Sequence, residues 1–155
     1  AERAEIGLQV MANTLIAVGS IMLVFGLLSS LFDLLAFALL LWVMAADERG
    51  FQTGWFLLSL WTEIAVVLVL RSARPAWRSR PARLLLVSSV VVALAAFAVP
   101  YLGTVSALFG FVPLSPWEML AIVALVTAYV AANEAAKRWF WRRVRPEAPE
   151  AARSA

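Results

Sequence analysis

The sequence lacks cysteine and histidine entirely, and only 15% of its 155 residues are charged. The absence of cysteine excludes disulfides, thiolate nucleophiles and cysteine-ligated metals, and the absence of histidine excludes imidazole ligands and histidine-based acid–base catalysis. The sequence also has no glycine-rich phosphate loop and no serine nucleophile with a partner histidine. A cation held by this chain would need oxygen ligands, which suit hard ions. We therefore expect no catalytic residue and no cofactor-binding residue in the chain.

Apolar residues dominate the sequence instead, at 63% of the chain, with a mean hydropathy of +0.87. A soluble domain of this size cannot hide so much apolar surface. Four stretches approach or exceed the roughly 20 residues that cross the hydrocarbon core of a bilayer. These stretches are 21–46, 51–70, 84–101 and 116–136. The sequence predicts an all-α fold, a polytopic four-helix membrane bundle over 21–145 that contacts the lipid bilayer.

The N-terminal apolar region is longer than one span requires. It runs from Ile6 to Ala46, which is about 60 Å as a single helix. Either 1–20 is a helical extension that continues into the first span, or two spans lie within 6–46. Polar residues in the first part favour the extension; they are Gln9, Asn13, Thr14 and Ser20. At the other end we expect 146–155 to be disordered, because this segment is low in complexity.

Basic residues gather on one side of the predicted bundle. Segment 71–83 holds five arginines, and the C-terminal region adds Lys137, Arg138, Arg142, Arg143 and Arg145. The opposite connections are poor in basic residues, since 47–50 has one arginine and 102–115 has no charge. The positive-inside rule then predicts that both termini are cytoplasmic in a multi-pass protein of the cell (inner) membrane. This topology also accounts for the net charge of +3 without a nucleic-acid partner.

The start of the fourth span has a helix-capping signature. Ser115 is followed by proline at the first helical position, and Glu118 comes three residues after the serine. A serine and a glutamate at this spacing form a capping box. We therefore interpret Glu118 as a capping residue at the outer surface and not as a ligand.

Asp33 lies inside the first apolar run, where a carboxylate costs roughly 2.5–3.5 kcal/mol on insertion scales. Gly19, Gly26 and Asp33 are spaced by seven, and Ser29 and Ser30 precede the aspartate by four and three residues. On a helix these positions form a stripe of small and polar residues that another helix can approach closely. Asp33 either helps to hold a cation or proton pathway or ties two helices together, and the tie is the simpler interpretation.

Glu63 is the second carboxylate within a predicted span. It has Ser59 one turn before it and Thr62 beside it, and it lies roughly 10 Å from the end of the span at Leu70. The glutamate side chain is too short to reach water easily from that depth. The ion-pathway interpretation and the structural interpretation are equally supported here.

A third acidic residue, Glu134, lies near the end of the fourth span. Lys137 and Arg138 follow it at three and four positions, which predicts an ordinary helical ion pair at the membrane edge. The neighbouring Asn133 could donate a hydrogen bond to another helix. We expect both Asn133 and Glu134 to be structural polar residues.

Several segments, taken in order, resemble one known family. They are GLLSSLFDLLAF (26–37), FQTGWFLLSLWTEIAVVLVLRS (51–72), RSRPARLLL (78–86), VPY (99–101), FVPLS (111–115) and AYVAANEAAKRWFWRR (128–143). Together they resemble the last four membrane helices of magnesium-transporting P-type ATPases, over roughly residues 21–143. No single motif decides the match, but the combination of FD, FQTGWF and KRWF is specific.

This resemblance implies a scaffold role for the chain. In that family, ATP hydrolysis through an aspartyl-phosphate drives ion movement, and earlier helices build most of the transport site. Magnesium ion and ATP are thus implied for the full-length family and not for this chain alone. By resemblance, Glu63 matches an acidic or amide position near the ion, and Asp33 matches a supporting aspartate. The Asp-Lys-Thr-Gly phosphorylation motif, the nucleotide-binding domain and the first six helices have no counterpart in the sequence, and 1–20 does not resemble the linker that should precede the seventh helix.

Two hypotheses follow from these observations. The first is a membrane scaffold of a cation pump, inactive unless joined to the remaining domains of a P-type ATPase. The alternative is a free-standing four-helix protein that acts as an ion conductor or an accessory subunit. Such a protein would need a homo-oligomer to enclose a polar path around Asp33 and Glu63. Whether the chain is a fragment or an independent protein is left open by the sequence.

Overall fold

The computed structural model describes residues 2–71 and 83–144, and these residues form helices joined by short connections. The elements are α1 (Glu2–Ala38), the π-helical turn η1 (Leu39–Val43), α2 (Glu48–Leu70), α3 (Arg83–Ala98), the 3-10 turn η2 (Val99–Tyr101), α4 (Thr104–Phe109) and α5 (Pro116–Val144). Within these two ranges there is no β-strand. Arg74, Arg78 and Arg80 of segment 71–83, Arg145 and the predicted disordered tail 146–155 lie outside the described residues.

Four of these helices are long and apolar enough to cross a membrane by length and composition. They are Arg3–Val43, Glu48–Leu70, Arg83–Tyr101 and Pro116–Arg143. The all-α, four-helix membrane fold predicted from the sequence is therefore confirmed, and the chain is a multi-pass membrane protein.

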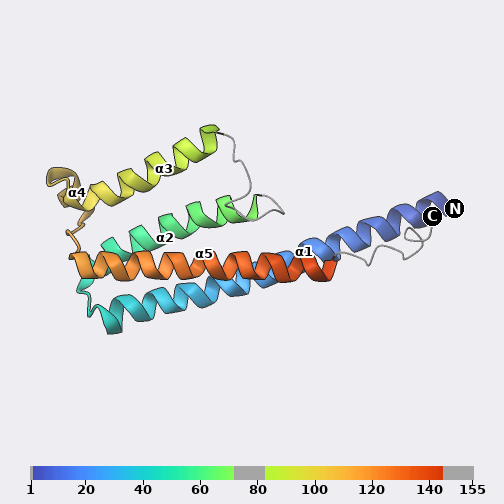
Figure 1. The fold of residues 1–155 in the computed structure, drawn as a ribbon, viewed down its shortest axis with the longest axis horizontal. Helices are drawn as coiled ribbons and strands as arrows, with labels where there is room; N and C mark the ends of the chain where they lie inside the picture. The colour runs from blue at the N-terminus through green and yellow to red at the C-terminus, as the bar shows by residue number, and fades with distance from the viewer. Residues whose placement is uncertain (1, 72–82, 145–155) are drawn as a thin grey trace, which may run out of the picture.

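The N-terminal region forms one continuous helix and not two spans. Helix α1 runs without a break from Glu2 to Ala38, and its first half extends beyond the other helices (Figure 1). Its residues from Arg3 to Leu15 are all exposed in the isolated chain. The helix ends in η1, where Ala46 N donates to Leu40 O at 3.0 Å and Ala45 adopts a positive φ of 47°. This turn allows the chain to reverse into α2.

The long helices alternate in direction, so their ends gather at two ends of the bundle (Figure 1). We call the end with residues 44–47 and 99–115 the loop end. The other end, where α2 and α5 finish and α3 begins, carries Arg71, Arg83, Arg142 and Arg143 and is called the basic end. Helix α5 packs against both α1 and α2, while α3 packs against α2. The direction of each helix therefore brings Arg71, Arg83, Arg142 and Arg143 to the same end of the bundle.

The hydrophobic core lies in the half of the bundle nearest the loop end. Leu40, Leu57 and Ile122, from η1, α2 and α5, are completely buried. The rest of the core cluster is Ala36, Met44, Leu58, Ala96 and Leu114. Gly54 permits the closest approach in this core, because a Cβ there would lie 2.4 Å from Leu40 Cδ2. The packed core holds the loop-end half of α1, α2 and α5 together.

The predicted capping box at the start of α5 is present. Glu118 Oε2 accepts from the Ser115 backbone N–H and from Ser115 Oγ, each at 2.7 Å. Helix α2 has its own cap, because Asp47 Oδ1 accepts from Gly50 N at 2.8 Å. These caps satisfy N–H groups that have no partner within their helices. They fix where α2 and α5 begin at the loop end.

Candidate functional site

A cavity of about 110 Å³ lies between α1, α2 and α5. Its polar lining consists of Ser29 and Asp33 from α1, Ser59, Thr62 and Glu63 from α2, and Tyr129 from α5. The apolar lining consists of Phe32, Ala36, Trp55, Leu58, Val66 and Leu125. A water molecule occupies about 30 Å³ in the liquid, so the cavity is large enough for a few waters or a partly hydrated ion.

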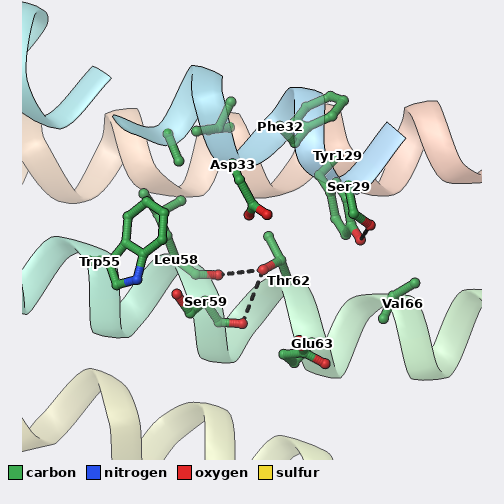
Figure 2. A pocket seen from close by; sticks show the side chains of 12 residues that line it. Ser29, Phe32, Asp33, Trp55, Leu58, Ser59, Thr62, Glu63, Val66 and Tyr129 are labelled. Carbon is green, nitrogen blue, oxygen red and sulfur yellow. Dashed lines mark hydrogen bonds between the residues drawn. The ribbon is translucent and has the colours of Figure 1, made fainter. Parts of the chain in front are cut away.

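Helical spacing explains why the polar residues of α1, and those of α2, lie on the side of each helix that lines the cavity. Ser29 and Asp33 are one turn apart on α1, and Ser59 and Glu63 are one turn apart on α2. Figure 2 shows Asp33 reaching from α1 toward α2, with Thr62 opposite it. The two carboxylates that the sequence singled out thus line the same cavity, although 30 residues separate them in the chain.

The inner wall of the cavity is held by Tyr129, a residue that the sequence analysis did not single out. Its hydroxyl is 2.9 Å from Ser29 Oγ, and its ring meets Phe32 edge-on at a centroid distance of 5.2 Å (Figure 2). The side chain is only 4% exposed. A tyrosine within an apolar helix usually finds a partner for its hydroxyl, which is the signal that could have identified it. Tyr129 therefore ties α5 to α1 beside Asp33.

The serines of α1 differ from expectation. We predicted that Ser29 and Ser30 would form part of the stripe around Asp33, but Ser29 bonds Tyr129 and Ser30 is exposed outside the cavity. The glycines of this stripe also lack a close neighbour within the described residues, since a Cβ at Gly19 or Gly26 would meet nothing within 4 Å. Only the part of the stripe around Ser29 and Asp33 contacts another described helix.

The cavity has an open side, and its two carboxylates point in different directions: in Figure 2 Asp33 points toward α2, whereas Glu63 points away from α1. Asp33 and Glu63 are both exposed in the isolated chain, and among residues 2–71 and 83–144 neither forms a hydrogen bond or ion pair. Helix α5 packs against both α1 and α2 and leaves both carboxylates exposed. Thr62 Oγ1 donates to Leu58 O and Ser59 O at 2.8 and 3.0 Å, so its oxygen is left to accept or to coordinate.

The donor set suits a hard cation but is too small to enclose one. Two carboxylates and several hydroxyls line the cavity, and oxygen is the ligand that such cations prefer. No group of three or more acidic residues that could hold a metal occurs in the part of the chain that the structure describes. The cavity can therefore contribute some ligands to a cation or its waters, but other groups would have to complete the shell.

The ion pair predicted at Glu134 is present, but it is buried and does more than predicted. Lys137 Nζ is 2.9 Å from Glu134 Oε1, with the two side chains only 4% and 5% exposed. The same ammonium donates to Val69 O at 2.7 Å, across the interface with α2. Val69 contributes one of the last carbonyls of α2, which lack partners within the helix. Lys137 thus caps α2 from α5, which sequence spacing within α5 could not reveal.

Asn133 lies next to this pair and is completely buried. Its Nδ2 donates to Tyr129 O at 2.9 Å, within α5. The predicted bond to a neighbouring helix is not found among the described residues, because the amide turns back along its own helix. Within those residues Asn133 Oδ1 has no hydrogen-bond partner.

Comparison with known proteins places this arrangement in context. The model of a family described as "Cation transporting ATPase, C-terminus" matches residues 13–139. The chain is 32% identical over 133 residues to the Magnesium-transporting ATPase, P-type 1 of Escherichia coli K12. It is 30% identical over 135 residues to a protein of the same name from Salmonella typhimurium LT2. Each match covers 81% of this chain, which spans only 14% of the length of either relative.

Proposed function

This chain belongs to the cation-transporting ATPase C-terminus family, and we propose that it is the C-terminal membrane part of a magnesium-transporting P-type ATPase. In this proposal the four spans form a scaffold that supports the ion pathway and catalyse nothing alone. ATP hydrolysis and phosphorylation belong to the remaining domains of the pump, which are the partners of this chain. The magnesium specificity rests on the names of the relatives.

The observation that carries the proposal is the cavity shared by Asp33 and Glu63. A carboxylate at membrane depth is costly unless it meets a partner, water or an ion. Neither has a partner among the described residues, and half of the residues that line their shared cavity are polar. We propose that Glu63 contacts the cation or its hydration shell directly and that Asp33 supports it. The hydroxyls of Ser59 and Thr62 would add neutral oxygen ligands on the Glu63 side.

The scaffold would be oriented with both termini in the cytoplasm of a cell with an inner membrane. The arginines at the basic end support this orientation through the positive-inside rule. The loop end, with its uncharged 102–115 segment, would then face the outside. Residues 1–20 would form a helical extension that leads from the preceding part of the pump into the first span.

Transport by the longer protein tests the proposal. Glu63→Gln and Asp33→Asn keep the shape of each side chain and remove its charge. We expect Glu63→Gln to weaken apparent magnesium affinity about 10–100-fold, the usual cost of losing a group that holds or orients a metal ligand, and Asp33→Asn to have a smaller effect. Glu5→Gln, an exposed carboxylate on the extension, is the matched control. Unchanged magnesium uptake by Glu63→Gln would show that Glu63 has a structural role and does not contact the cation.

The reading frame upstream of residue 1 gives a second test. An Asp-Lys-Thr-Gly motif in the same or an adjacent frame would support the pump. Magnesium-independent ion conduction by the purified chain alone would instead favour a free-standing oligomeric conductor.

A further inference from the structure

A second polar feature runs along α2 from its first turn to Glu63. Glu48, Gln52, Ser59 and Glu63 lie at intervals of four, eleven and fifteen residues from Glu48. At about 100° per residue, these positions fall within about 60° of arc on one face of the helix. We call these four residues the α2 lane. It extends over roughly 22 Å, from the loop end to the cavity.

The α2 lane lines a groove that is separate from the cavity but adjoins it. The groove has a volume of about 750 Å³ and is lined by all four lane residues. It shares Trp55, Ser59 and Glu63 with the cavity that contains Asp33. Glu63 therefore stands at the junction of the two spaces.

The loop-end segment forms the outer wall of this groove. Gln52 Nε2 donates to Phe109 O at 3.2 Å, and the Phe56 and Phe111 rings stack at a centroid distance of 4.8 Å. Thr53 Oγ1 accepts from Val112 N at 3.0 Å on the adjoining face of α2. These contacts fix residues 109–112 beside the lane without covering Glu48 or Glu63, which are both exposed.

Charge and polarity indicate what the groove admits. A lane of polar groups over this length is unfavourable against lipid, so it should face water. A carboxylate stands at each end and no basic residue lines the groove, which favours cations over anions. The other five residues that line the groove are apolar, and four of them are aromatic, a side-chain type whose ring faces can attract cations.

We infer that the α2 lane is one wall of a hydrated access route by which a cation passes between the loop-end surface and Glu63. This inference rests on the proposed function and adds the route and its side of entry. The opposite wall would come from the remaining membrane helices of the pump.

Cysteine accessibility tests the route, because this chain has no cysteine and any cysteine elsewhere in the longer protein can be replaced beforehand. Gln52→Cys and Ser59→Cys are made singly in the longer protein, in sealed membrane vesicles, and treated with a cationic membrane-impermeant thiosulfonate from either side. Val90→Cys is the control, since this residue of α3 is 49% exposed and lines neither space. Thiols react as thiolates, which require water, so we expect both lane cysteines to react at least about tenfold faster than the control.

Direction and charge sharpen the test. The cationic reagent should react when it is added from the loop end, and an anionic thiosulfonate should react more slowly. Adding Glu63→Gln should reduce the preference of Ser59→Cys for the cationic over the anionic reagent. A Ser59→Cys rate equal to that of Val90→Cys, or reaction only from the basic end, would overturn the route. The reaction is also measured with magnesium added. Fast reaction from the loop end that magnesium does not slow would support the route but contradict magnesium as the ion that uses it.

Discussion

At the scale of single residues, the cavity depends on a hydrogen bond that crosses between helices. Ser29 and Tyr129 join α1 to α5 directly beside Asp33. The sequence identified both carboxylates because charges are rare within apolar runs. It could not pair Ser29 with a residue 100 positions away, since spacing along one helix carries no information about the partner helix.

Tyr129→Phe tests the contribution of this bond. Removing the hydroxyl leaves the ring packed on Phe32 and should lower the free energy of unfolding by about 1 kcal/mol. The measurement is denaturant unfolding in detergent micelles, followed by tryptophan fluorescence. Ser29→Ala should cost a similar amount, and the double variant should cost little more than either single one. Additive costs would mean that the two hydroxyls do not stabilise each other.

At the scale of elements, α2 and α5 are locked at both ends of the bundle. The core around Leu57 and Ile122 joins them toward the loop end, and Lys137 caps α2 at the basic end. The start of α5 and its cap were predictable, because Ser115 and Glu118 lie close together in sequence, but α5 continues to Val144, beyond the predicted end at 136. The π-helical turn η1, the short helix α4 and the Lys137 bond were not predicted, because each depends on contacts between distant segments.

Lys137→Met tests the lock at the basic end. This change keeps most of the side-chain volume but leaves the Glu134 carboxylate buried without its ammonium partner. Removing one member of a buried pair costs about 3–5 kcal/mol, so the variant should unfold far more readily. Unfolding in detergent measures this loss.

The double variant Lys137→Met/Glu134→Gln removes both charges and should recover much of the lost stability. The exposed Arg142→Gln, on the same helix, should have almost no effect. Equal losses for the single and double variants would show that the pair itself contributes little and that packing dominates.

At the scale of the whole molecule, the alternating helices place both described connections, 44–47 and 99–115, at the loop end. Hydropathy predicted the four spans and the fold class well, because lipid requires long apolar helices. The open side of the cavity was not predicted. Sequence can indicate that a carboxylate needs a partner, but it cannot indicate whether this chain or another segment supplies it.

Orientation follows from labelling single cysteines in intact cells. Thr104→Cys lies in α4 at the loop end, and Arg142→Cys lies in α5 at the basic end, both at exposed positions. An impermeant maleimide should label the first cysteine from outside and the second only after the membrane is opened. The reverse pattern would contradict cytoplasmic termini.

Protection of Glu63 by magnesium tests the central claim most directly. In the longer protein, a membrane-permeant carbodiimide is applied with and without magnesium, and the modified residues are identified by mass spectrometry. The account predicts that magnesium slows the modification of Glu63 and, to a lesser extent, Asp33, while Glu118 in its capping box is unaffected. Identical modification of Glu63 with and without magnesium would contradict the claim that this cavity lies on the ion pathway.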